Sequence, residues 1–180
     1  MRKVITEIIE MPSDISCEFL HNVLKCKKGN AELSRVINVP CLSTKIDGKN
    51  IVLHCENGNK NDLKVIKTTA AHIKNMFSGL NEKFVYKLQA VNVHFPMSLK
   101  VEGDKLMINN FLGEKTPRAA NILKNVSIEV KGPAITLSSQ NKEAIGQTAA
   151  NIERATKIRS KDRRIFQDGI YITEKAGRAI

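Results

Sequence analysis

Aromatic residues are scarce in this sequence of 180 residues, which has six Phe, two Tyr and no Trp. Proteins that recognise unpaired bases by stacking usually carry more exposed rings, so that mode of binding is not expected here. Apolar runs are short too, and none approaches the roughly 18 uncharged residues of a membrane-spanning helix. The first residues reach Glu7 and Glu10 without the apolar segment of a signal peptide. We therefore expect a cytoplasmic protein that does not span a membrane.

Motifs for catalysis and cofactor binding are also missing. The sequence has no P-loop, dinucleotide fingerprint, zinc-protease helix, EF-hand loop or nucleophile elbow. The four histidines are scattered, and His94, at the end of a predicted strand, is expected to be packed or hydrogen-bonded rather than catalytic. A Cys–His pair assembled by folding stays open as an alternative. We expect no enzyme: no catalytic residue, no metal, no cofactor and no small-molecule substrate.

The four cysteines do not have the spacing of a zinc site. They are Cys17, Cys26, Cys41 and Cys55, and no pair is separated by two or four residues. Two disulfides are permitted in principle, but nothing else indicates an oxidising compartment. We expect reduced thiols that act as small, mostly buried apolar side chains.

Positive charge is the main surplus in the composition. The formal net charge is +11 and the pI is near 9.6. Lys and Arg release condensed counterions when they neutralise phosphates, so a nucleic acid or an anionic membrane is favoured as a partner. Together with the shortage of aromatic rings, the charge predicts recognition of the backbone and shape of folded RNA or DNA.

A repeat within the chain predicts the fold. Residues 66–73 and 145–152 agree at five of eight positions, around a shared Thr-Ala-Ala. Upstream of each lies a predicted hairpin with a glycine turn, at Gly48 in the first copy and at Gly132 in the second. We therefore expect an α+β fold with two tandem similar domains, each a mostly antiparallel sheet covered by one main helix. The predicted domains are residues 1–81 and 82–180.

The expected elements follow from apolar periodicity. In the first half the predicted strands are 5–10, 16–27, 31–38, 42–47 and 50–55. In the second half they are 84–95, 98–102, 105–112, 126–131 and 134–139. Asn61 and Gly79 are expected to cap the first helix, and Asn141 the start of the second.

Basic residues concentrate near the carboxyl end. Residues 1–80 carry a net charge of +4 and residues 81–180 one of +7. Residues 154–164 (the basic segment, RATKIRSKDRR) contain six basic side chains and Asp162. The helix dipole accounts for Arg154 and Lys157, but the other four lie beyond the expected helix end. These four, Arg159, Lys161, Arg163 and Arg164, are predicted to contact phosphates.

Three longer motifs resemble those of a known family. Residues 110–115 (NFLGEK), 146–153 (GQTAANIE) and 162–171 (DRRIFQDGIY) are similar to the large-subunit ribosomal protein L6 (L-six) family, numbered nine in eukaryotes. Residues 93–97 (VHFPM) resemble its archaeal and eukaryotic branch. The resemblance covers essentially the whole chain. Many relatives have a second arginine after Arg118, where this chain has Ala119.

The resemblance implies a ribosomal protein that binds large-subunit rRNA. It implies a structural role in translation, near the sarcin–ricin loop and the region where translation factors dock. The implied partners are large-subunit rRNA, neighbouring ribosomal proteins and, close by, translational GTPases, with no membrane as a partner. Residue by residue, it adds Lys115 and Arg118 to the four candidates of the basic segment, and it assigns most RNA contact to the C-terminal half.

Two other functions stay open at this stage. A free nucleic-acid-binding regulator would share the charge but would not sediment with ribosomes. A small hydrolase or transferase would need a cleft with a perturbed acid or base.

Overall fold

The computed structural model describes residues 3–40, 42–162 and 164–180. The chain divides into two compact units, Met1–Glu82 (unit 1) and Lys83–Ile180 (unit 2). Cys41 and the candidate Arg163 lie outside the described residues.

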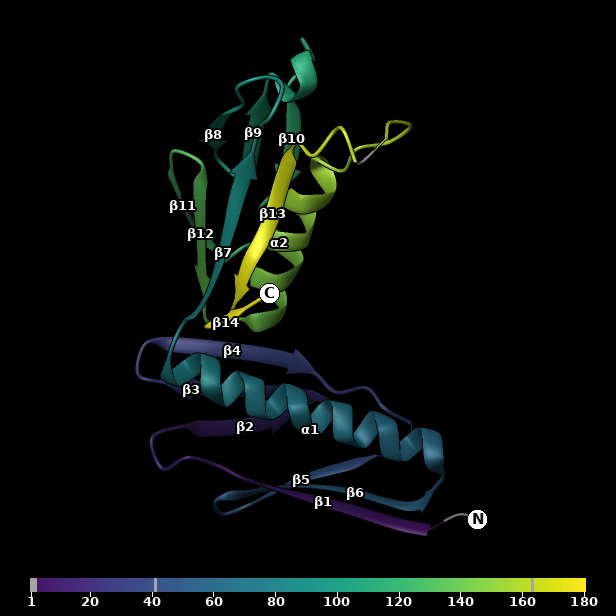
Figure 1. Cartoon of the computed structure of the whole chain (residues 1–180). Coiled ribbons are helices and arrows are strands. Elements are labelled where there is room, and N and C mark those ends of the chain that lie inside the picture. The colour runs from purple at the N-terminus through teal and green to yellow at the C-terminus, as the bar shows by residue number, and fades with distance from the viewer. Residues whose placement is uncertain (1–2, 41, 163) are drawn as a thin grey trace. The chain divides into compact units, whose positions relative to one another are not determined.

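Unit 1 contains two antiparallel three-stranded sheets and one helix (Figure 1). The first sheet has the order β1 (Lys3–Glu10), β6 (Asn50–Gly58), β5 (Ser43–Asp47). The second has the order β2 (Ser16–Leu20), β3 (Val23–Lys28), β4 (Ala31–Val36). Helix α1 (Lys60–Asn81) contacts strands of both sheets and so closes the core between them.

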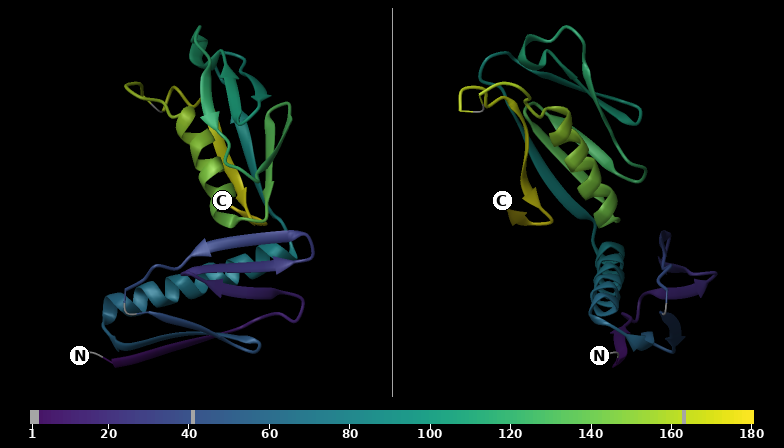
Figure 2. Two further views of the ribbon diagram at one scale, coloured as in Figure 1. Left: turned by 180° about the vertical axis from the view of Figure 1, so that it is seen from behind. Right: turned by 90° about the vertical axis from the view of Figure 1, so that its right-hand side faces the viewer.

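Unit 2 repeats this plan and extends it. Its larger sheet has the order β11 (Ser127–Lys131), β12 (Ala134–Ser139), β7 (Phe84–Val91), β13 (Gly169–Lys175), β14 (Arg178–Ala179). Its smaller sheet has the order β8 (Ser98–Glu102), β9 (Lys105–Asn109), β10 (Arg118–Asn121). A short 3-10 turn, η1 (Phe111–Gly113), precedes β10. Helix α2 (Lys142–Ala155) contacts both sheets and runs along the larger one in both views of Figure 2.

The two units have the same strand order, which confirms the α+β fold with two similar sheet-and-helix domains. The order β1-β6-β5 corresponds to β7-β12-β11, and β2-β3-β4 corresponds to β8-β9-β10. Unit 2 differs by β13, which pairs antiparallel with β7 on the side away from β12. In the sheet of unit 1 the equivalent strand, β1, has β6 as its neighbour and forms the edge.

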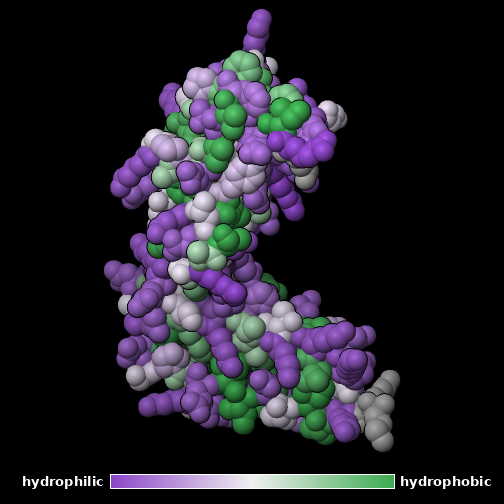
Figure 3. Space-filling view, viewed as in Figure 1, coloured by the Kyte–Doolittle hydropathy of each residue, from purple (hydrophilic) through white to green (hydrophobic). Residues whose placement is uncertain are grey.

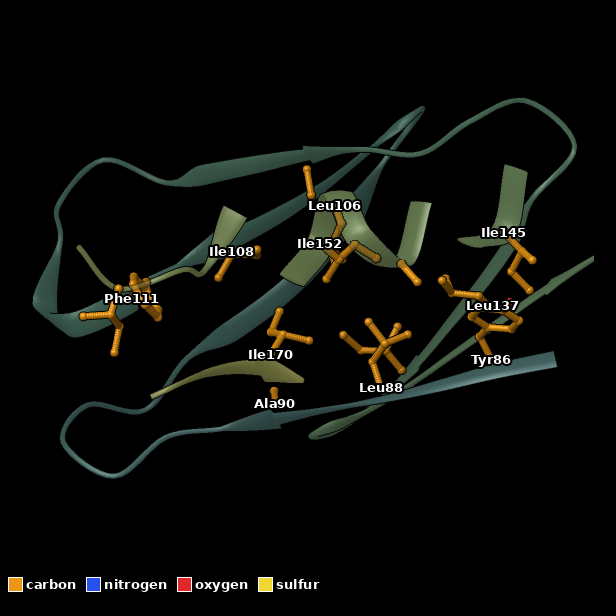
Figure 4. Packing of buried hydrophobic residues seen from close by; sticks show 14 residues of the cluster. Tyr86, Leu88, Ala90, Leu106, Ile108, Phe111, Leu137, Ile145, Ile152 and Ile170 are labelled. Atoms are coloured by element: carbon orange, nitrogen blue, oxygen red, sulfur yellow. The ribbon is translucent and has the colours of Figure 1, made fainter. Parts of the chain in front are cut away.

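The repeated Thr-Ala-Ala segments are the buried faces of the two helices. Ile66 and Ile73 of α1 are at most 1% exposed, and so are their equivalents Ile145 and Ile152 of α2. In unit 2 these side chains meet Leu88, Leu137 and other apolar residues of both sheets, as Figure 4 shows. Small alanines on the same face let each helix lie close to its sheet.

The helix ends were predicted in part. Asn141 caps α2, where its side chain accepts from the backbone N–H groups of Glu143 and Ala144. The predicted cap Asn61 was wrong, because Asn59 accepts from the N–H of Asp62 while the Asp62 carboxylate accepts from the N–H of Asn59. This reciprocal pairing needs the acid three residues after the cap. Gly79 was also wrong as a stop, since α1 continues to Asn81 and buries Leu80.

Left-handed residues divide two segments that were predicted as single strands. His21 and Asn22 have φ of 49° and 62° and turn the predicted strand 16–27 into the β2–β3 hairpin. Asn110, with φ of 58°, ends β9 at Asn109 instead of at residue 112. Asn tolerates this conformation better than most residues do.

No helix in the described ranges is both long and apolar enough to span a membrane. On the face seen in Figure 3, hydrophilic side chains predominate and apolar ones form small separate patches.

Substituting equivalent core residues of the two units should lower the free energy of unfolding of each unit by a similar amount. We expect Ile73→Ala and Ile152→Ala each to lower the free energy of unfolding of its unit by about 2–5 kcal/mol, because each leaves a cavity at a fully buried site. Urea unfolding followed by circular dichroism measures this. Ile8→Ala is the control because Ile8 is 60% exposed. A loss as large for Ile8 as for Ile73 would contradict the assigned core.

Candidate nucleic-acid interface

The 110–118 loop projects from the end of unit 2 and is anchored by one buried ring. Phe111 is 1% exposed and belongs to the core, while Lys115 is exposed. Gly113 has φ of 77°, a left-handed conformation that L side chains rarely adopt. The Asn110 side chain donates to the carbonyl of Pro96 at 3.0 Å. The loop is thus held at its base and presents Lys115 to solvent.

Arg118 joins this loop to the end of α2. Its Nε donates to Glu114 Oε2 at 2.7 Å, and its Nη1 donates to the carbonyl of Ala155 at 2.8 Å. The guanidinium also lies 4.3 Å from the centroid of the Phe111 ring. The hydrogen bond from Arg118 lowers the pKa of Glu114 against the opposing effect of partial burial, and the charge of Arg118 adds to the lowering. Arg118 therefore has a structural role at the position where the resemblance implies RNA contact.

Beyond the end of α2, buried and exposed side chains alternate along the basic segment. Thr156 is 2% exposed, and its Oγ1 accepts from the N–H of Ile170 at 2.9 Å. Ile158 is 8% exposed, whereas Lys157 and Arg159 are exposed. Because alternate side chains are buried, the cations between them face solvent.

The second part of the segment carries its own ion pair. Arg164 donates through Nε and Nη2 to the Asp162 carboxylate, with a shortest distance of 2.7 Å. The side chain of Arg164 is 90% exposed. Hydrogen bonds from the side chain and backbone of Arg164 lower the pKa of Asp162. Lys161 Nζ lies 4.6 Å from the centroid of the Phe166 ring.

A buried carboxylate, that of Asp168, fixes the end of the segment that connects α2 to β13. Asp168 is 1% exposed, and its Oδ1 accepts from the N–H groups of Val93 at 2.8 Å and His94 at 3.0 Å. Its Oδ2 lies 2.6 Å from Nδ1 of His94, whose ring stacks on Phe166 at 4.8 Å. The expectation that His94 is packed or hydrogen-bonded is therefore confirmed.

The loop and the basic segment border one depression of about 540 Å³ (the basic depression). Both lie at the end of unit 2 where α2 ends and β10 begins (Figure 1). Five cationic side chains and one carboxylate line the basic depression: Arg118, Arg154, Lys157, Arg159, Lys161 and Glu114. Three of the predicted residues, Arg118, Arg159 and Lys161, thus meet at one surface. Lys115 and Arg164 are exposed outside the lining.

Sequence reasoning missed two cations of this surface. Arg154 and Lys157 were assigned to the helix dipole, but both line the basic depression. Both also line a second depression of about 390 Å³ beside Phe166, Gln167 and Tyr171. Both residues belong to the basic segment, and this clustering was the feature of the sequence that could have identified them. The described residues contain no group of three or more His, Cys, Asp or Glu side chains that could hold a metal ion.

The site lies in a region that known proteins share. The family model described as Ribosomal protein L6 matches residues 95–169, which include the 110–118 loop and the basic segment. The chain is 42% identical over 177 residues to the large ribosomal subunit protein uL6 of Methanococcus vannielii, covering 98% of this chain and 97% of that protein. It is 43% identical over 176 residues to the large ribosomal subunit protein uL6 of Methanosarcina mazei, covering 98% and 100%.

The buried Asp168 should make stability depend on acid pH. Burial acts to raise the pKa of this carboxyl, but hydrogen bonds from His94 and Val93 outweigh it, so the pKa lies below the ordinary 3.8. A lowered folded-state pKa contributes stability above the unfolded value, and that contribution is lost as the pH falls through the folded value.

We therefore expect Asp168→Asn to lower the urea midpoint at about pH 7 and to flatten the loss of stability below pH 3.8. Urea unfolding at a series of pH values measures both effects. Glu102→Gln is the control, because this carboxylate is exposed on β8. Equal acid dependence in wild type and Asp168→Asn would contradict the assigned role.

Proposed function

This chain belongs to the ribosomal protein L6 family, and from that premise we propose that its basic depression binds large-subunit rRNA near the sarcin–ricin loop. The chain is a structural, non-enzymatic protein of the large ribosomal subunit, with rRNA and other ribosomal proteins as its partners. The proposal adds the contact surface, its position on the rRNA and the nearby docking region of translational GTPases.

The observation that carries the proposal is the meeting of two separate cationic segments at one depression. Five cations and one carboxylate line it, so its field is positive. Phosphate neutralisation releases counterions and supplies sequence-independent affinity, while a concave surface adds shape recognition. Aromatic stacking is not needed, because the rings beside this surface are occupied by Arg118, Lys161 and His94.

The candidate cations have different roles in this proposal. Lys115 and Arg159 have no carboxylate within salt-bridge distance among the residues that the structure describes, and Lys161 rests on a ring. These three can meet phosphates without losing an ion pair. Arg118 and Arg164 each hold a carboxylate, so they contact RNA with donors that their partners leave unused. Arg163, outside the described residues, stays a proposed contact on its sequence position.

Salt dependence of rRNA binding tests the surface. A triple variant, Lys115→Ala with Arg159→Ala and Lys161→Ala, should bind a large-subunit rRNA transcript more weakly. The slope of log K against log salt should become shallower by about 2 to 3, close to one for each phosphate that the variant no longer neutralises. Filter binding over a range of salt concentrations measures the slope.

A charge-matched control separates a local effect from a loss of net charge. Lys100, Lys124 and Lys131 are exposed in unit 2 and do not line the basic depression. Their triple replacement by Ala also removes three charges and should leave the slope close to that of wild type. Equal slopes for the two triple variants would refute the surface formed by the basic depression and Lys115 of the 110–118 loop as the contact surface.

Chemical footprinting tests the position on the rRNA. The wild-type chain should protect nucleotides near the sarcin–ricin loop in large-subunit rRNA, and the first triple variant should lose that protection while the control keeps it. Protection elsewhere with the same salt slope would leave rRNA binding intact and refute the proposed position. Co-sedimentation with large subunits through a high-salt wash distinguishes a subunit protein from a free regulator.

A further inference from the structure

Two cysteines face each other across the β2–β3 hairpin of unit 1. The hairpin turns through two residues, His21 and Asn22, both with positive φ. The pairs that follow the turn are Leu20 with Val23, Phe19 with Leu24, Glu18 with Lys25, and Cys17 with Cys26. Cys17 and Cys26 are therefore direct cross-strand partners, with side chains on the same face of the sheet.

The register places the two cysteines at a position suited to a disulfide. In a two-residue hairpin the pair next to the turn exchanges both backbone hydrogen bonds, and bonded and non-bonded pairs then alternate. Counting from the turn, Cys17 and Cys26 form the second non-hydrogen-bonded pair. Cα atoms in such pairs lie about 4.5 Å apart, within the range found across disulfides. The two sulfur atoms themselves are 2.8 Å apart.

The environments of the two thiols differ. Cys26 is fully buried in the core of unit 1, whereas Cys17 is half-buried on β2, at the edge of its sheet. The hydrogen bond between the sulfurs lowers the pKa of Cys17, against the opposing effect of burial. The same bond, followed by burial and by the charge of Cys17, raises the pKa of Cys26. Because Cys17 is the more exposed of the two sulfurs, it has the character of the attacking thiolate, and the buried Cys26 has that of the resolving thiol.

We propose that Cys17 and Cys26 form a modification site that a low-molecular-weight disulfide, such as oxidised glutathione, converts reversibly to a cross-strand disulfide. The Cys17 thiolate attacks one sulfur of the small disulfide, whose S–S bond breaks and releases one thiolate. Cys26 then loses its proton and attacks Cys17 Sγ, which releases the second small thiol. The two cysteines together lose two protons and two electrons, and the small disulfide gains both.

The fold can accept this bond with little rearrangement. The new link encloses residues 17–26, which the β2–β3 ladder already holds in register. Cys55 offers an internal comparison, because it is equally buried but lies on β6, in the other sheet of unit 1. An apolar packing role alone explains Cys55, but it does not explain two thiols at hydrogen-bonding distance across one hairpin.

Peptide mapping by mass spectrometry of the full-length chain tests the proposal. The chain is equilibrated in glutathione buffers of increasing oxidation, quenched with acid, alkylated and digested. We expect a linked pair of peptides containing Cys17 and Cys26, lighter by two hydrogen atoms than the reduced pair. Two of the four thiols should be lost together, and dithiothreitol should restore them. Absence of the link under the most oxidising buffer would overturn the proposal.

Single substitutions test the order of the two steps. Cys26→Ser should accumulate a stable glutathione adduct on Cys17, because the resolving thiol is gone. Cys17→Ser should leave the buried Cys26 unmodified, and Cys55→Ser should leave the Cys17–Cys26 link unchanged. If Cys26→Ser fails to fold, modification of Cys26 in the Cys17→Ser chain would by itself overturn the assignment of Cys17 as the attacking group. The same mapping on purified large ribosomal subunits tests whether the pair reacts in the assembled particle.

Discussion

The position of the basic segment depends on the hydrogen bonds that the buried carboxylate of Asp168 accepts. After α2 ends at Ala155, the chain must return to β13, which begins at Gly169. Asp168 fixes that return by accepting the amides of Val93 and His94, so the connection meets the end of β7 at one place. Because a buried carboxylate without these donors would be strongly unfavourable, the donors and the acid hold each other in position. The cations between the two ends are carried on a connection fixed at both sides.

The internal repeat made most of the fold predictable, because hydrophobic periodicity and turn residues recur in both halves. The hairpin turns at Gly48 and Gly132 and the cap at Asn141 depend on local preferences that short segments express. Strand β13 was not predicted, since it is defined by pairing with β7, which is distant in sequence. Strand β10 was missed as well, and it is only four residues long. The prediction of Asn61 as the helix cap was wrong for a different reason. Two nearby asparagines could cap α1, and the hydrogen bonds with Asp62 select Asn59.

Charge composition located the candidate surface but did not assign roles to its side chains. The density of Lys and Arg in residues 154–164 is visible in the sequence. The hydrogen bond from Arg118 to the Ala155 carbonyl is not, because it joins a loop to a helix end 37 residues away. The same holds for Arg154 and Lys157, whose contribution to the basic depression depends on where the 110–118 loop folds. Sequence therefore predicts which segments are cationic, and the three-dimensional structure decides which cations are available.

The additional strand of unit 2 has a consequence for where a duplicated fold presents its cationic side chains. In unit 1 the chain leaves its helix and continues directly into the next unit, so β1 stays at a sheet edge. In unit 2 the chain turns back and covers the corresponding edge of β7 with β13. That return needs a connection between helix and strand, and the connection is where the arginines and lysines gather. Covering a sheet edge and presenting a cationic surface are thus two results of one extension of unit 2.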